Sequence, residues 1–425
     1  MATKTLPVSL DALEALTQDH PTPFHLYDEV AIRRFARELL NTFDHASLPG
    51  YRNYFAVKAL PNPEIMRILQ EEGMGFDCSS YAELLLCEQV GAHKGTLPNG
   101  MPRIMFTSNN TPADDFRKAV ELGAIVNLDD LTHVDYLRRE LGEFPSLMCF
   151  RYNPGPLRTF GDSHDFIIGS PEEAKFGMTR GQLFEGYAAL RDAGVTRFGL
   201  HTMVVSNERH TDALAETATM LFDLVEELTE TLGIQFDFVN LGGGFGVAYR
   251  PEEPQLDIDC VAQKIARLRA DRPALANVQV VTENGRRITG PYGYLVTRVR
   301  HTKDTYRKYL CVDACMANLM RPGMYDAYHH ITVPGKPAEP TETYDVVGSL
   351  CENNDKFAVQ RTLPVSGVGD LMVLHDSGAH GHAMGFNYNG KLRSAELLLQ
   401  KDGSVRVIRR AETYDDLFAT LNFTQ

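Results

Sequence analysis

The sequence predicts an α/β protein in which a (β/α)8 TIM barrel is followed by a β-rich C-terminal domain that also takes in the N-terminal segment. Two observations carry this prediction. Eight short runs of apolar and β-branched residues alternate with stretches of helical periodicity over roughly 230 residues, a length typical of this barrel. Beyond about residue 290, strand-like runs predominate and long helical patterns become rare.

The elements follow in chain order. Residues 22–40 (TPFHLYDEVAIRRFARELL) begin with a strand signal ahead of the barrel, which we expect to join the C-terminal sheet. The eight barrel strands are expected at residues 54–59, 75–79, 103–108, 124–128, 146–152, 197–204, 236–241 and 278–283. Helices are indicated by the periodicity of residues 63–73, 81–92, 111–123, 180–194 and 214–233.

The second domain is expected to be built from strands at residues 294–303, 307–314, 343–349, 370–376 and 404–410. The predicted division is therefore an N-terminal segment at 1–45, a barrel at 46–290 and a β-rich domain at 291–425.

Composition narrows the class of function. The formal net charge of -14 disfavours nucleic acid and anionic membranes as partners, and leaves small molecules or other proteins. Seven scattered cysteines without a CxxC pair argue against a disulfide framework or a structural zinc site. The N-terminus carries no secretory signal pattern and no apolar run of transmembrane length occurs, so we expect a soluble cytoplasmic protein.

Three weak signals fall at expected strand ends, where a TIM barrel builds its active site. Lys58 lies in the apolar run YFAVKAL, Gly242, Gly243 and Gly244 follow the seventh strand, and Glu283 ends the eighth. Each has a plain alternative: a lysine reaching water from an edge strand, a flexible turn and a solvated carboxylate. Together they suit pyridoxal 5′-phosphate, which needs a Schiff-base lysine, a phosphate cradle and a partner for its ring nitrogen.

Several collinear motifs then resemble the alanine-racemase-like, fold type III pyridoxal phosphate enzymes, and among them the diaminopimelate and ornithine decarboxylases. The resemblance is closest to diaminopimelate decarboxylase and covers nearly the whole chain. It rests on YFAVKA, FDCSSYAELLL, AKFGM, LGGGFG, ENGR, RPGMYDAYH, VVGSLCE, GDL, NYN and RSAELL.

The resemblance implies that Lys58 holds the cofactor and that Gly242, Gly243 and Gly244 grip its phosphate. Glu283 would bond the ring nitrogen, and because alanine racemases of this fold place an arginine there, it favours a decarboxylase over a racemase. We expect Lys58 to be desolvated in its strand and flanked by cationic groups, which would help its amine to form imines.

The resemblance also implies roles for residues of the second domain. Cys351 would protonate the substrate carbon across a dimer interface, so a homodimer with shared active sites is expected. The matched positions around the cofactor are His201, Met203, Ser206, Arg286, His380 and Tyr388. Those around the substrate are Arg286, Arg321, Tyr325 and Glu352, in which an arginine fork suits a distal carboxylate.

Some segments depart from the family. HTMVVSN places Met203 where the family's second histidine stacks on the cofactor ring, while His201 and Ser206 still match. Asn284 replaces a proline, Asn353 a serine, and His380 a tyrosine that binds phosphate. Substrate identity is therefore the open point.

The predicted activity is decarboxylation of an amino acid with a charged distal end, at a D-configured centre, with meso-diaminopimelate as the default substrate and L-lysine as its product. The alternative is a D-lysine or D-ornithine decarboxylase in which Glu352 meets the distal ammonium. A non-catalytic regulator of the same fold is a third possibility, which Lys58, Glu283 and Cys351 argue against. A racemase or a pure cofactor carrier fits less well still.

Overall fold

The computed structural model describes residues 4–48, 50–157 and 170–423, and the chain divides into two compact units. The barrel unit comprises Arg33–Val247 and Gln255–Ile288. The β-rich unit comprises the described residues of Met1–Ile32, Ala248–Pro254 and Thr289–Gln425. The barrel unit begins at Arg33, where the sequence predicted residue 46, and ends at Ile288, where it predicted residue 290. The short segment Ala248–Pro254 belongs to the β-rich unit, although in sequence it lies between the seventh and eighth barrel strands.

Eight parallel strands form the closed barrel, in the order in which they occur in the chain, and the first pairs with the last. They are β2 (Arg52–Ala56), β3 (Gly75–Cys78), β4 (Ile104–Ser108), β5 (Ile125–Leu128), β6 (Leu147–Tyr152), β7 (Arg197–Thr202), β8 (Phe236–Asn240) and β9 (Gln279–Thr282). Each overlaps an expected strand, so the predicted TIM barrel is confirmed.

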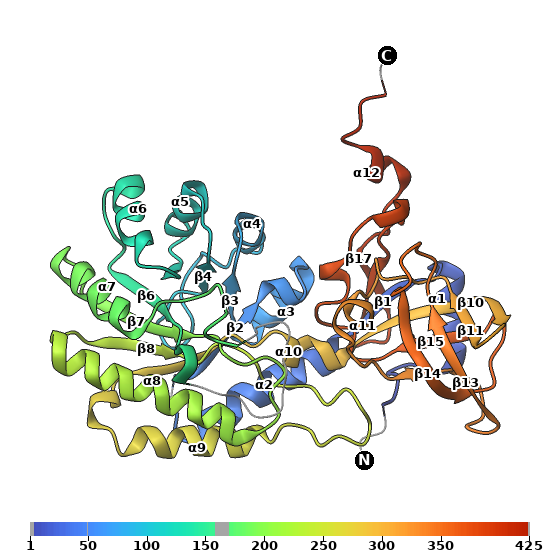
Figure 1. Cartoon of the computed structure of the whole chain (residues 1–425), viewed down its shortest axis with the longest axis horizontal. Helices are drawn as coiled ribbons and strands as arrows, with labels where there is room; N and C mark the ends of the chain where they lie inside the picture. The colour runs from blue at the N-terminus through green and yellow to red at the C-terminus, as the bar shows by residue number, and fades with distance from the viewer. Residues whose placement is uncertain (1–3, 49, 158–169, 424–425) are drawn as a thin grey trace. The chain divides into compact units, whose positions relative to one another are not determined.

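The barrel helices are α2 (Glu29–His45), which begins in the β-rich unit, α3 (Pro63–Glu71), α4 (Tyr81–Gln89), α5 (Ala113–Glu121), α6 (Thr132–Leu141), α7 (Arg180–Asp192), α8 (Thr211–Leu232), α9 (Ile258–Ala270) and α10 (Arg286–Thr289). Figure 1 shows the labelled barrel strands with helices such as α4, α5, α6 and α8 outside them. Local sequence sets several of the helices' first turns. Asn62 caps α3 ahead of Pro63, Ser80 caps α4, and Thr179 with Gln182 forms a capping box on α7.

Large apolar side chains fill the barrel interior. Tyr54, Met105, Phe238 and Val281 belong to one buried cluster contributed by different strands. Gly199 on β7 makes room for this packing, because a Cβ there would lie 2.1 Å from the ring of Phe238. The barrel is thus a packed core, and its chemistry has to lie at the strand ends.

The β-rich unit is built on a nine-stranded sheet, in which seven strands follow the order β14-β13-β11-β10-β1-β16-β17, β15 also pairs with β10, and β12 pairs with β15. The strands are β1 (Phe24–Asp28), β10 (Gly293–Asp304), β11 (Lys308–Val312), β12 (Ile331–Thr332), β13 (Thr341–Val347), β14 (Lys356–Pro364), β15 (Leu371–Leu374), β16 (Ala395–Leu399) and β17 (Val405–Arg409). The helices are α1 (Leu10–Asp19), α11 (Arg321–Tyr325) and α12 (Tyr414–Phe418).

Strand β1 pairs antiparallel with β10 and parallel with β16, which confirms that the N-terminal segment joins this sheet. Strands β12, β14 and β16 were not expected from the sequence. Strand β14 is an edge strand whose residues mix charge with a terminal proline, a composition that hides the alternation of a strand.

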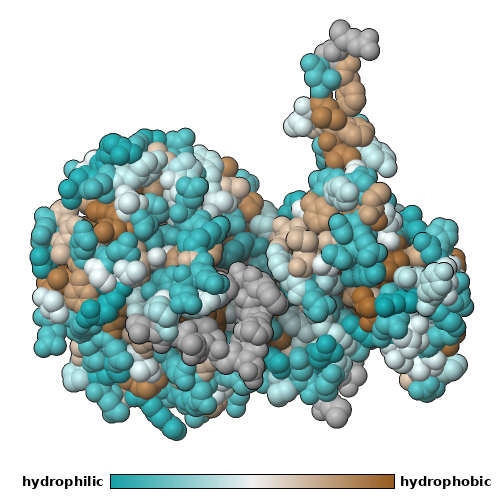
Figure 2. All heavy atoms as spheres, in the orientation of Figure 1, coloured by the Kyte–Doolittle hydropathy of each residue, from teal (hydrophilic) through white to brown (hydrophobic). Residues whose placement is uncertain are grey.

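Exposed apolar side chains gather at the end of the β-rich unit. On α12 and the residues after it, Tyr414, Phe418, Leu421 and Phe423 are all exposed, and Phe423 retains 73% of its accessible area. Figure 2 shows hydrophobic atoms on the segment near the C-terminus. The rings of Tyr414 and Phe418 stack with centroids 6.0 Å apart. Among the described residues, no helix combines the length and the apolar character needed to cross a membrane.

Candidate active site

Lys58 lies just beyond the carboxyl end of β2, in the single 3-10 turn Val57–Ala59. Its side chain is 53% exposed, and its Nζ lies 3.8 Å from Oδ2 of Asp77. The expectation of a desolvated lysine within an apolar strand and among cations is therefore wrong. Strand β2 ends at Ala56, so Lys58 lies in the turn that follows the strand, where its amine is accessible and faces the side chain of Asp77.

Glu283 follows β9 and is buried, with 7% of its area exposed. Its Oε2 accepts a hydrogen bond from Nε2 of His201 at 2.9 Å, and its Oε1 accepts one from Nδ2 of Asn240 at 2.7 Å. Burial alone would raise the pKa of Glu283. The charge and hydrogen bond of His201, the charge of Lys58 and the bond from Asn240 outweigh burial and hold that pKa below its usual value. Glu283 is thus a buried carboxylate kept ionised.

Three further ionisable side chains, those of Asp77, Asp129 and Arg151, lie at this end of the barrel, and sequence reasoning had not singled them out. Asp77 on β3 faces Lys58, and burial together with the charge of Glu283 raises the pKa of Asp77 well above its usual value. Arg151 on β6 lies 3.5 Å from Oδ1 of Asp129, and burial lowers the pKa of Arg151. The signal that could have found them is their common place at or near the ends of the barrel strands β3, β5 and β6.

The glycine loop after β8 is not a flexible turn. A Cβ on Gly242 would lie 2.2 Å from the carbonyl oxygen of Thr202, and one on Gly243 would lie 2.6 Å from that of Glu283. Gly242 and Gly244 also adopt positive φ angles, of 68° and 103°. Glycine is therefore required here because the loop is packed against the ends of β7 and β9.

The amides of this loop have partners of unequal strength. The N–H of Gly242 donates to Oδ1 of Asn240 at 2.9 Å, whereas the N–H of Gly243 donates to Sδ of Met203 at 3.2 Å. A thioether is a weak acceptor, so the Gly243 amide can exchange it for a stronger one. Met203 thus contacts the predicted phosphate cradle directly.

Arg286 and Ser206 also meet at this end of the barrel, where the guanidinium donates to Oγ of Ser206 at 3.3 Å. Asn284, found where the family has proline, makes two bonds that proline could not make. Its N–H donates to Oδ1 of Asn53 at 2.8 Å, and its own Oδ1 accepts from the N–H of Phe245 at 3.0 Å.

The remaining predicted residues belong to the β-rich unit. Cys351 and Glu352 are exposed on the loop between β13 and β14, and the N–H of Cys351 donates to Oδ1 of Asn389 at 2.8 Å. Asn389 follows Tyr388, whose side chain is exposed, so the structure brings Cys351 and the Tyr388 segment together. His380 is half-buried and has a left-handed φ of 55°.

Arg321 and Tyr325 lie at the two ends of α11. Arg321 is buried, its guanidinium donates to the hydroxyl of Tyr249 at 2.8 Å, and it lies 3.2 Å from Nε2 of His329. Tyr325 is half-buried. The predicted substrate arginine is therefore already held by a hydrogen-bonded aromatic pair, which fixes the direction of its fork.

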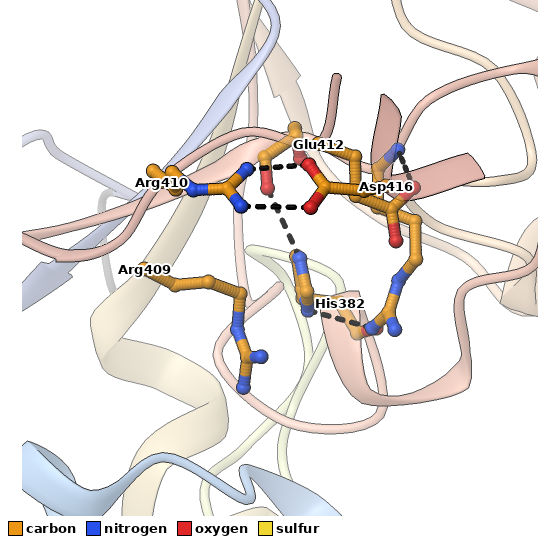
Figure 3. A pocket seen from close by; sticks show the side chains of 7 residues that line it. His382, Arg409, Arg410, Glu412 and Asp416 are labelled. Atoms are coloured by element: carbon orange, nitrogen blue, oxygen red, sulfur yellow. Dashed lines mark hydrogen bonds and ion pairs between the residues drawn. The ribbon is translucent and has the colours of Figure 1, made fainter. Parts of the chain in front are cut away.

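A separate cavity of about 280 Å³ in the β-rich unit holds none of the predicted residues (Figure 3). Arg410 donates two hydrogen bonds to Asp416, at 2.5 and 2.7 Å, and Arg409 pairs with the buried Glu396. Arg393 bonds His382, and burial lowers the pKa of His382 to about 3. The side chains that line this cavity are thus joined by ion pairs and hydrogen bonds.

The barrel-end residues fit pyridoxal 5′-phosphate. Lys58 presents an accessible amine, Glu283 an ionised carboxylate, and the glycine loop a backbone that no side chain can cover. The buried polar atoms without a hydrogen-bond partner among the described residues include Oδ1 of Asp77, Nδ1 of His201 and Nδ2 of Asn284, which belong to this site. Unpaired buried polar atoms of this kind are expected where a polar group binds.

Known proteins resemble the chain over most of its length. The family described as pyridoxal-dependent decarboxylase, pyridoxal binding domain, matches residues 32–290. Protein TabA of Pseudomonas amygdali pv. tabaci is 41% identical over 404 residues, covering 95% of this chain and 92% of TabA. Diaminopimelate decarboxylase of Methanothermobacter thermautotrophicus is 35% identical over 416 residues, covering 97% and 94%. The crystal structure of diaminopimelate decarboxylase from M. jannaschii in complex with L-lysine matches with a TM-score of 0.85 at 28% identity, covering 96% and 94%.

Proposed function

Because this chain belongs to the pyridoxal-dependent decarboxylases, we propose that it removes carbon dioxide from an amino acid with a charged distal end, at a D-configured centre. The chain is a carboxy-lyase that uses pyridoxal 5′-phosphate. Meso-diaminopimelate is the proposed substrate and L-lysine the product, since relatives over nearly the whole chain carry the name diaminopimelate decarboxylase.

The observation that best supports this function is the buried, ionised Glu283 at the same barrel end as the accessible amine of Lys58. When bound, pyridoxal 5′-phosphate supplies an electron sink for the electron pair released as the carboxyl group leaves. A carboxylate kept ionised by His201 favours a protonated ring nitrogen, which a positively charged partner would not. The charge at Glu283 therefore suits decarboxylation.

Residues of the barrel unit divide the work of holding the cofactor. Lys58 would hold it through Nζ, while Gly242, Gly243 and Gly244, with Arg286 and Ser206, would hold its phosphate. His201 orients Glu283, because its Nε2 bonds the carboxylate from within the core. Met203 would pack against the ring face, since it contacts the same loop.

Residues of the β-rich unit would bind the substrate and donate a proton to its carbon. The sulfhydryl of Cys351 would protonate the carbon that has lost carbon dioxide, in a site of a partner subunit, with His380 and Tyr388 near the cofactor. The exposed apolar side chains of α12 and the following residues support a homodimer, because such groups mark interaction surfaces. Sedimentation of the full chain tests the homodimer.

Two substrate classes remain to be separated. Arg286, Arg321 and Tyr325 would bind a distal carboxylate through an arginine fork, which selects meso-diaminopimelate. The exposed Glu352 would instead meet a distal ammonium, which selects D-lysine or D-ornithine. Met203 and Asn353 differ from the residues that the family has at these positions, and these differences support the second candidate.

The decisive experiment measures carbon dioxide release by the cofactor-loaded protein. The panel contains meso-diaminopimelate and the D and L forms of lysine, ornithine and arginine. We expect release from meso-diaminopimelate alone. Release from D-lysine or D-ornithine without release from meso-diaminopimelate would replace the proposed substrate with a D-diamino acid, and absence of release from every member would refute the proposal.

A further inference from the structure

The loop that carries Cys351, residues 348–355 between β13 and β14, is anchored by hydrogen bonds to the buried carboxylate of Asp355. Asp355 is 3% exposed, its Oδ2 accepts from the N–H of Leu350 at 2.8 Å, and its Oδ1 accepts from that of Met316 at 2.8 Å. The N–H of Gly348 donates to the carbonyl of Asp355 at 3.0 Å, and a Cβ on Gly348 would lie 2.3 Å from its Oδ2. This loop therefore has a fixed base.

Its exposed tip is held from outside by Asn389. The side-chain oxygen of Asn389 accepts the N–H of Cys351 at 2.8 Å, across 38 residues of chain. Asn389 has a φ of 55° and a ψ of 22°, a left-handed conformation that asparagine adopts more readily than most residues. This backbone turn and the side-chain bond together require asparagine, aspartate or a similar residue at the position.

A bond to the N–H of Cys351 fixes the backbone from which its Cβ and Sγ project. A group that delivers a proton to carbon has to be placed to within a few tenths of an ångström, and an exposed loop tip does not supply that placement by burial. The neighbouring residue, Tyr388, is itself predicted to contact the cofactor. Asn389 thus ties the thiol to a segment with a role in the same site.

We propose that Asn389 is a positioning residue for the Cys351 sulfhydryl, acting through its hydrogen bond to the Cys351 amide. The inference rests on the proposed function of Cys351 as proton donor. It concerns Asn389 alone, and does not depend on which amino acid is decarboxylated.

Two variants separate the hydrogen bond from the backbone conformation. Asn389→Gly keeps the left-handed turn but removes the acceptor, whereas Asn389→Asp keeps both. Asn387→Ala is the matched control, because Asn387 lies two residues away and bonds Lys391 and Glu412 rather than the Cys351 loop. Each variant is tested as the cofactor-loaded full chain.

The readouts are kcat and KM for carbon dioxide release and the rate at which iodoacetamide alkylates Cys351, followed by mass spectrometry of the peptide. For Asn389→Gly we expect kcat to fall about fivefold with KM within twofold, and the alkylation rate to change about fivefold, as loss of one typical hydrogen bond implies. Asn389→Asp and Asn387→Ala should stay within twofold of the parent in both.

The inference is overturned if Asn389→Gly stays within twofold of the parent in both readouts, or if Asn389→Asp is as impaired as the glycine variant. A Cys351→Ala variant separates this inference from the proposed function. If Cys351→Ala retains full kcat, the proton-donor role fails, while the alkylation rates of the Asn389 variants still decide whether Asn389 holds the loop.

Discussion

Replacing Glu283 with glutamine is expected to slow decarboxylation by a factor of about 10 to 100. The change removes one charge from a buried site and leaves its size nearly unchanged. Glu283 now accepts bonds through both oxygens, from His201 and from Asn240. A glutamine offers one acceptor oxygen, so one of these donors would face an NH2 group in its place.

The magnitude follows from the bond that glutamine cannot make. A hydrogen bond to a charged group contributes about 1.5–3 kcal/mol, and each 1.36 kcal/mol corresponds to a factor of ten in rate. If Glu283 bonds the ring nitrogen as proposed, loss of one such bond would lower kcat by about 10- to 100-fold. The retained donor of His201 limits the loss, because it can still bond the remaining oxygen.

The assay is carbon dioxide release by the cofactor-loaded protein, with the visible absorption of the cofactor recorded in parallel. Glu208→Gln is the matched control, since Glu208 is also a buried carboxylate of the barrel unit bonded to a histidine, His210. We expect that control to keep kcat within threefold. If Glu283→Gln keeps kcat within threefold while binding cofactor normally, the reasoning on its charge is wrong.

Three other predictions concern the cofactor and the stability of the β-rich unit. Lys58→Ala should abolish turnover and the visible absorption of a lysine-bound cofactor; persistence of that band would place the attachment elsewhere. Gly243→Ala should weaken cofactor affinity at least tenfold by equilibrium dialysis, because its Cβ would meet the carbonyl of Glu283 at 2.6 Å; unchanged affinity would contradict the cradle. Burial lowers the pKa of His25 to about 4 and that of His382 to about 3. Since these rings stay neutral when folded but take up protons near pH 6.5 when unfolded, stability should fall below pH 6.5 by up to about 1.4 kcal/mol per pH unit for each ring. Urea unfolding of the full chain followed by circular dichroism at pH 7.5 and 5.0 measures this; equal midpoints would contradict it.

The barrel was predictable because its signal is local. Each strand is a short apolar run and each long helix an amphipathic one, so alternation along the chain is enough to count eight units. The same reasoning found β1 and most of the second sheet. It missed β14, whose charged residues hide its alternation although it pairs with the preceding strand β13, and it missed β16, which pairs with β1 at the opposite end of the sequence.

The candidate site divides differently. Lys58, Glu283 and the three glycines could be picked out because each is unusual in its local sequence. Asp77 and Arg151 were missed although they lie near strand ends, because the local sequence around an aspartate or arginine does not show which partner it will face. The hydrogen bond from the amide of Gly243 to the sulfur of Met203 was equally hidden, although the substitution itself was visible.

The sequence by itself determined the alternation of strands and helices, the order of the motifs and the residue types available for chemistry, because these depend on neighbours along the chain. The tertiary structure decided where those residues act. It places Lys58 in a turn after its strand and brings His201 to Glu283, which keeps that carboxylate ionised. It also places Asn389 where its side chain accepts a hydrogen bond from the Cys351 amide. These outcomes depend on burial and on partners brought together from distant segments, and no local pattern encodes either.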